Sequence, residues 1–234
     1  MAPGTPHTAL LVFSLSAWQE AGRKQPFGAQ RQKAGQQFFQ QLIDHTEALA
    51  RQSGLELIWV GEEQQQGENF GARFTHAIES VFARGYQRLI AIGSDSPDLS
   101  PQLLQDAITA LNQGQMVLGP ALDGGAYLIG LHRRHFEAAS FEALPWSQPW
   151  LYRALLEWGQ AQGLSAHPLR PLADIDDFRS LKHYLALRPL SRWTRLAQRL
   201  LQRAAFAPPQ PPLGLPAWLI GYLHPLRGPP TSDS

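Results

Sequence analysis

Residues 89–131 most constrain the fold, because short apolar runs alternate there with acidic and glycine turns. Residues 89–92 are too few for a helix, and a run of this kind that ends at Gly93 is typical of a strand buried on both faces. Ser100 and Pro101 supply an N-cap and a first-turn proline, and apolar residues then recur at helical spacing as far as Asn112. We therefore expect a strand, an acidic turn, a helix, a strand, a glycine turn and a further strand, in that order.

Acidic residues follow the first of these strands directly, at Asp95 and Asp98. Open α/β sheets bind ligands beyond the carboxyl ends of their parallel strands, and carboxylate oxygens there can hold a hard divalent ion. Aspartate and proline are also ordinary turn residues, so the pair can equally cap a turn and solvate a loop. Asp123-Gly124-Gly125 can likewise be only a hairpin turn. Taken alone, these residues favour the turn interpretation.

Four segments occur together in an order that resembles a known family. They are GSDSPDLSPQLL at 93–104, LGPALDGGAYLIGL at 118–131, LPWS at 144–147 and ADIDDFRSL at 173–181. Together they resemble a bacterial family of the nucleotide-diphospho-sugar transferase superfamily. That family is related to glycosyltransferases associated with arsenosugar biosynthesis, and more distantly to molybdenum-cofactor and phospholactate nucleotidyltransferases. The resemblance covers residues 9–185 and implies a GT-A, Rossmann-like α/β fold. The alternation of strands and helices independently indicates one α/β domain, with a mainly parallel sheet and helices on both faces.

The resemblance implies a divalent metal, Mg or Mn, held by Asp95 and Asp176. Asp174 would brace the second acidic turn, and Asp177 would cap the helix that follows it. The metal would neutralise charge that develops on a diphosphate leaving group. The alternative is that all the aspartates of residues 174–177 are turn and capping residues.

The same resemblance assigns the acceptor side of the site. Asp123 is the candidate general base for an acceptor hydroxyl. Gly124 and Gly125 would leave room for the acceptor. Trp146 would stack on a sugar or acceptor, or else it fills the core, which is the commoner fate of a tryptophan.

The segment after the first strand departs from the family. Family members carry a glycine and basic loop of the form PGRVKTRL, whereas this chain has SLSAWQEAGRKQPFG at 14–28. Its cations can be phosphate ligands or simply solvated charges. Further on, QQQGENFGARF at 64–74 resembles a family turn in which glycines let the backbone approach the nucleotide and an arginine meets a phosphate or braces the loop. The nucleotide contacts implied are Arg23, Lys24, Gly67, Gly71, Arg73 and Ser94.

Composition limits the classes of partner. The chain has 20 Lys and Arg against 19 Asp and Glu, a net charge of +1, so no global field recruits nucleic acid. It has no cysteine, which excludes disulfides, thiolate catalysis and cysteine-bound zinc and fits a cytoplasmic location. No run approaches the roughly 20 apolar residues that a transmembrane helix needs, and the N-terminus lacks the basic region of a signal peptide.

We expect the transferase-like domain to span 1–190 and a separate tail to span 191–234. The tail begins with a basic amphipathic helix and continues in a proline-rich segment. The helix carries Arg192, Arg195, Arg199 and Arg203 on one face. It can contact a membrane surface or a partner, but packing of its apolar side on the protein's own body is favoured.

The leading functional hypothesis is a metal-dependent glycosyltransferase that moves a sugar from a nucleotide diphosphate sugar to a small acceptor. A nucleotidyltransferase would use the same metal on a triphosphate, and the altered basic loop argues against it because a triphosphate carries more charge. A third hypothesis is a binding module that has lost catalysis. The expected partners are therefore a nucleotide sugar and a small-molecule acceptor.

Overall fold

One mixed sheet forms the centre of the protein. The computed structural model describes residues 8–205. Within them, six strands are ordered β2-β1-β3-β5-β4-β6. All of them except β5 run in the same direction, and β5 is antiparallel to both of its neighbours. The strands are β1 (Thr8–Phe13), β2 (Glu56–Val60), β3 (Arg88–Ile92), β4 (Met116–Pro120), β5 (Ala126–His132) and β6 (Ala166–Pro168). The predicted mainly parallel α/β architecture is confirmed.

Side-chain hydrogen bonds cap the start of several helices. Ser100 accepts a hydrogen bond from the amide of Leu103 at the start of α4, and Asn69 accepts one from Ala72 at the start of α3. The helices are α1 (Ala17–Lys24), α2 (Gln32–Gln52), α3 (Phe70–Ala83), α4 (Pro101–Asn112), α5 (Ala138–Glu142), α6 (Leu151–Ala161), α7 (Phe178–Leu187) and α8 (Arg192–Ala205). Short 3-10 turns lie at Ala29–Arg31, Glu62–Gln64 and Arg133–His135. Helix α1 stands where family members carry the basic loop.

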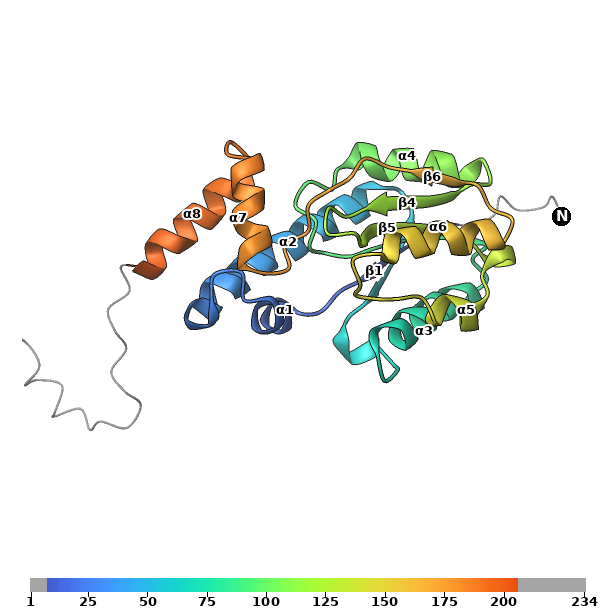
Figure 1. The fold of residues 1–234 in the computed structure, drawn as a ribbon, viewed down its shortest axis with the longest axis horizontal. Coiled ribbons are helices and arrows are strands. Elements are labelled where there is room, and N and C mark those ends of the chain that lie inside the picture. Colours follow the sequence, from blue (N-terminus) through green and yellow to red (C-terminus); the bar gives the residue numbers. More distant parts are fainter. Residues whose placement is uncertain (1–7, 206–234) are drawn as a thin grey trace, which may run out of the picture.

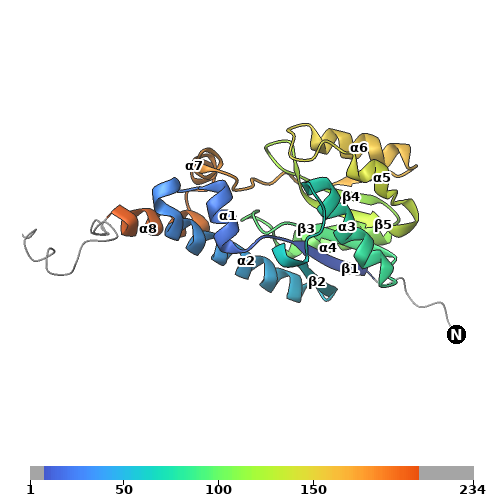
Figure 2. The same ribbon diagram turned by 90° about the horizontal axis from the view of Figure 1, so that it is seen from below.

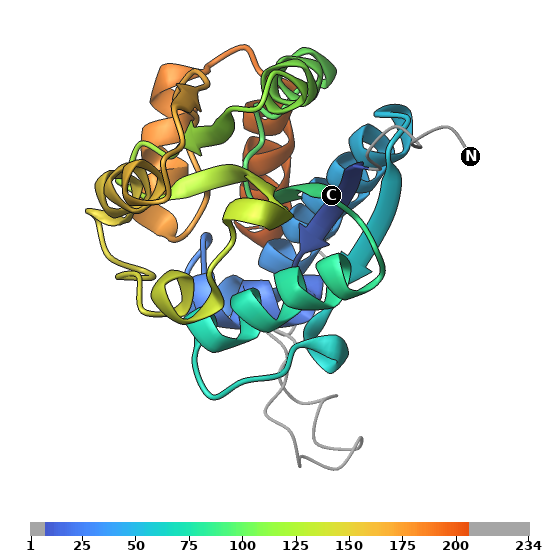
Figure 3. The same ribbon diagram turned by 90° about the vertical axis from the view of Figure 1, so that its right-hand side faces the viewer.

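The two faces of the sheet are covered by different helices, as Figure 3 shows from one end. Alternate residues of β1 enter opposite cores, because successive side chains of a strand point to opposite faces. Leu11 packs with α3, α5 and α6. Leu10 packs with α4 and the last turns of α2. Helices α2 and α3 therefore lie on opposite sides of the sheet.

A third core lies beyond the carboxyl end of β1 (Figures 1 and 2). It joins α1, the first half of α2, α7 and α8 into a helical lobe, with Phe38, Tyr184 and Trp193 at its centre. The basic helix expected to open the tail is therefore packed on the body through its apolar side, as favoured from the sequence. The side chain of Arg203 and the proline-rich segment lie outside the described residues.

The helical lobe forms hydrogen bonds to the acidic turn that follows β3. The indole of Trp193 donates a hydrogen bond of 2.7 Å to the carbonyl of Pro97. Asp98 accepts hydrogen bonds from Tyr184 Oη at 2.9 Å and Arg188 Nε at 2.8 Å. The conformation of this turn therefore depends on α7 and α8. Across residues 8–205 no helix is both long and apolar enough to span a membrane.

We expect Trp193→Phe to lower the free energy of unfolding by about 1–3 kcal/mol. The buried carbonyl of Pro97 loses the hydrogen bond from the indole, while phenylalanine keeps most of the ring volume. Urea unfolding followed by far-UV circular dichroism measures this loss. Gln198→Ala, an exposed change on the same helix, should stay within about 0.5 kcal/mol of the wild type. Equal stability of the two variants would contradict a structural role for this hydrogen bond.

Candidate functional site

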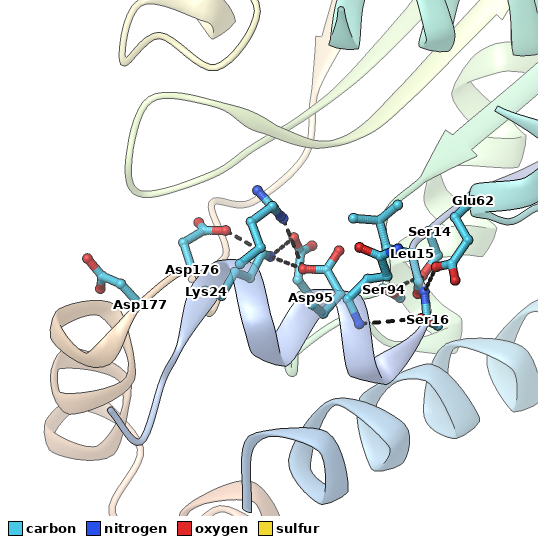
Figure 4. Close-up of polar contacts among 12 residues, drawn as sticks. Ser14, Leu15, Ser16, Lys24, Glu62, Ser94, Asp95, Asp176 and Asp177 are labelled. Atoms are coloured by element: carbon cyan, nitrogen blue, oxygen red, sulfur yellow. Dashed lines mark hydrogen bonds and ion pairs between the residues drawn. The ribbon is translucent and has the colours of Figure 1, made fainter. Parts of the chain in front are cut away.

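A pocket opens where β1 and β3 end side by side. The helices after β1 and β2 pack on opposite faces, so the gap between β1 and β3 is the topological switch point at which open α/β sheets bind ligands. The hydroxyls of Ser14 and Ser94, each just past its strand, are 2.6 Å apart (Figure 4). The pocket has a volume of about 360 Å³. It is lined from α1, α3, the turn after β3, the β4–β5 turn and residues 174–176.

The two acidic turns predicted to meet do meet beside this pocket. The amide of Ile175 donates a hydrogen bond of 3.1 Å to the carbonyl of Asp95. Between them lies a cation of the chain itself: Lys24 Nζ is 2.6 Å from Asp95 Oδ2 and 2.8 Å from Asp176 Oδ1 (Figure 4). A third carboxylate, Glu20, is 3.5 Å from the same nitrogen. Only 1% of the Lys24 side chain is exposed.

The electrostatics follow from this burial. Burial alone would lower the pKa of Lys24, but Asp95, Glu20 and Asp176 together raise that pKa above its ordinary value, so the lysine is charged. Burial acts against ionisation of Asp95, and the Lys24 charge overcomes it and lowers the Asp95 pKa. Burial, and then the Asp95 charge, raise the pKa of Asp174 well above its usual range. Asp174 accepts a hydrogen bond from the Ser96 hydroxyl, which agrees with its expected bracing role.

Lys24 occupies the space between the two carboxylates predicted to bind a divalent ion. Its ammonium contacts Asp95 Oδ2 and Asp176 Oδ1, one of the two oxygens of each predicted ligand. Within residues 8–205, no three His, Asp or Glu side chains form a group that could hold a metal ion. The proximity of the two carboxylates was predicted; the lysine between them was not.

The residues predicted to contact the nucleotide separate into two groups. Arg23, Arg73 and Ser94 line the pocket. Lys24 does not, because its ammonium is enclosed by carboxylates. The sequence predicted either a phosphate ligand or a solvated charge at this position, and the buried ion pair is neither. At Gly67 and Gly71, which were predicted to let a nucleotide approach, atoms of the protein itself lie close to the backbone. A Cβ at Gly67 would lie 2.7 Å from the amide nitrogen of Arg73, and one at Gly71 would lie 2.5 Å from Trp146.

On the acceptor side, Asp123, Gly125 and Trp146 line the pocket. Gly124 does not leave room for a ligand, since a Cβ there would lie 1.8 Å from the carbonyl oxygen of Pro149. Trp146 packs in the core, and its predicted stacking on a sugar or acceptor stays a prediction. Its ring packs among Phe70, Phe74 and Phe141, and it still contributes to the pocket wall.

Sequence reasoning missed Ser14, Glu20 and Gln65. Gln65 lines the pocket and donates a hydrogen bond of 3.1 Å to the carbonyl of Ser14. Glu20 precedes Lys24 by four residues, the spacing at which side chains meet on one face of a helix. That spacing, together with a helix beginning after Ser16, is the signal that could have revealed an internal ion pair.

The fold, a mainly parallel α/β sheet covered by helices on both faces, is shared with a solved protein. The structure resembles a protein of Desulfovibrio desulfuricans G20 whose assignment as a nucleotide-diphospho-sugar transferase is provisional. The TM-score is 0.68 at 23% identity, over 86% of this chain and 99% of that one. The chain belongs to a family described as uncharacterised proteins conserved in bacteria (DUF2064), whose sequence pattern matches residues 29–148.

Two further solved structures are more distant. A Mycobacterium tuberculosis H37Rv protein in complex with manganese has a TM-score of 0.45 at 14% identity, over 77% of this chain and 99% of that one. A CMP:2-keto-3-deoxy-manno-octonic acid synthetase complexed with CTP has a TM-score of 0.39 at 12% identity, over 78% of this chain and 98% of that one. Comparison with curated proteins finds no match.

The β4–β5 turn supports a prediction about how Asp123 is positioned. Gly124 and Gly85 both have left-handed backbone, at φ +94° and +99°, but only Gly124 is closely packed. Gly85→Ala should cost about 1–3 kcal/mol of stability through backbone strain alone. Gly124→Ala should cost about 1–3 kcal/mol more, because its methyl group overlaps Pro149. Thermal unfolding of both variants measures the difference, and equal losses would show that the turn moves freely away from Pro149.

Proposed function

We propose that the protein transfers a sugar from a nucleotide diphosphate sugar to a small hydroxyl-bearing acceptor. One observation carries the proposal. A single pocket at the switch point of the sheet is lined by two arginines, Arg23 from α1 and Arg73 from α3, and by the carboxylate of Asp123 from the β4–β5 turn. The fold shared with the superfamily supports the same function.

The arginines would bind the diphosphate. A guanidinium matches the paired oxygens of a phosphate better than an ammonium does. Arg73 lies in the first turn of α3, where the positive end of the helix dipole also favours an anion. Phosphate oxygens in the pocket would therefore meet the guanidinium and the helix dipole together.

Asp123 would serve as the general base. Its Oδ1 accepts a hydrogen bond of 3.0 Å from the amide of Gly125, which orients the carboxylate in the turn. The carboxylate would take the proton of the acceptor hydroxyl, whose oxygen forms the new bond to the anomeric carbon. The bond from that carbon to the diphosphate oxygen breaks, and the nucleoside diphosphate leaves with the electron pair. No metal takes part in this step, since Lys24 lies between the two carboxylates expected to bind one.

We expect nucleotide sugars to raise the melting temperature of the protein, and Arg73→Ala to weaken their binding about 10- to 100-fold, because charged hydrogen bonds are lost. Thermal shift with a panel of UDP-, GDP-, CMP- and dTDP-sugars, followed by calorimetric titration of the best, tests this. Arg51→Ala removes an exposed arginine outside the pocket and should bind like the wild type. If no nucleotide sugar shifts the wild type, the proposed function is wrong.

We expect Asp123→Asn to lower kcat by about 10²- to 10⁴-fold, because the amide cannot accept the proton. Its affinity for the nucleotide sugar should change less than that of Arg73→Ala. Release of nucleoside diphosphate in the presence of small polyol and alcohol acceptors gives the rate. Asp106→Asn, an exposed change on α4, is the control. A wild-type rate for Asp123→Asn would remove this residue from the mechanism.

A further inference from the structure

We propose that the Lys24 ammonium is the resident cation of this site, in the position between Asp95 and Asp176 that a divalent metal would otherwise occupy. The native chain then binds no metal between these carboxylates. That the substrate binds without a metal rests on the proposed function. That no metal binds between Asp95 and Asp176 does not rest on it.

The carboxylates around Lys24 match the hydrogen-bond donors of its ammonium. An ammonium has three N–H donors and no acceptor. Three carboxylates surround Lys24 Nζ: Asp95 at 2.6 Å, Asp176 at 2.8 Å and Glu20 at 3.5 Å. The side chain is 1% exposed, so the group is enclosed by anions rather than presented to a ligand. A lysine buried in this way compensates the charge of the carboxylates and does not contact a phosphate.

Packing of α1 fixes the position of the lysine. Ala17 and Ala21 of this helix are buried in the core of the helical lobe. Ser16 caps the start of the helix, and its side chain accepts a hydrogen bond from the amide of Gln19. The Lys24 ammonium also lies 5.6 Å from the centre of the Phe39 ring. The packed helix α1 therefore fixes the position of the cation.

A metal and the ammonium compete for the same space. Both would contact the carboxylates of Asp95 and Asp176, and two cations there would lie within a few ångströms. Their repulsion is stronger than in bulk water, because the Lys24 side chain is only 1% exposed. For a metal to bind, Lys24 would have to leave three anions and move a buried charge past the packed residues of α1.

Lys24 is thus a positioning residue. It would hold the two acidic turns together and offset their charge, so that an anionic substrate can approach Arg23 and Arg73. These functions are two that a divalent metal performs in an acidic site. Helix α1, which replaces the expected basic loop, brings this cation into the site from within the protein.

Mn²⁺ binding, followed by electron paramagnetic resonance on the full chain, tests the proposal. We expect no site in the wild type that depends on Asp95. Lys24→Met should bind one Mn²⁺ per chain at least tenfold more tightly than the wild type, and adding Asp95→Asn to it should abolish that site. Arg23→Met, which removes the adjacent cation of the same helix and leaves Lys24 in place, should gain no site.

Two results would overturn the proposal: a wild-type Mn²⁺ site that Asp95→Asn removes, or a folded Lys24→Met variant that gains none. If Lys24→Met does not fold, the wild-type measurement decides. A nucleotide-sugar thermal shift that is unchanged by EDTA supports metal-free binding, and one that EDTA abolishes contradicts it. If no nucleotide sugar binds, the proposed function fails while the Mn²⁺ comparison still decides the role of Lys24.

Discussion

Charge compensation around one buried ammonium connects the helical lobe to the end of the sheet. Lys24 belongs to α1, Asp95 follows β3 and Asp176 precedes α7. Removing one member of a buried ion pair leaves an uncompensated charge, which costs far more than a surface pair contributes. The position of α1 and the conformation of both acidic turns are therefore coupled, and all three contribute residues to the pocket wall.

The C-terminal helices are part of this arrangement. Asp98, which the sequence suggests is a turn residue, receives hydrogen bonds from Tyr184 and Arg188. Trp193 holds the neighbouring Pro97 carbonyl. The matched family segment ends at 148, and it excludes Lys24 as well as Asp176 and both C-terminal helices. The family segment thus contributes most of the strands. Lys24 and the C-terminal helices that hydrogen-bond to the acidic turn lie outside it.

The elements from β3 to β5 were predictable because local and tertiary requirements agree there. Ser100 and Pro101 start α4 in any context, and Asp123-Gly124-Gly125 makes the expected hairpin turn. The proximity of Asp95 and Asp176 came from the resemblance, since no local pattern reports a contact between such distant residues. Helix α1 was not predicted, because the burial of its lysine depends on carboxylates far along the chain. Glycines show that something approaches closely, but not what: at Gly67 and Gly71 it is the protein itself.

Glu20 connects the buried cation to the pocket. It contacts Lys24 on the inside and forms a 2.9 Å ion pair with Arg23, whose side chain is 58% exposed. Water reaches the Arg23 side of its pair with Glu20 and weakens that pair, whereas Lys24 is enclosed. A phosphate that drew Arg23 away would leave Glu20 still in contact with Lys24. By compensating the carboxylates from within, Lys24 leaves Arg23 available to an anionic ligand, as the proposed binding of a diphosphate requires.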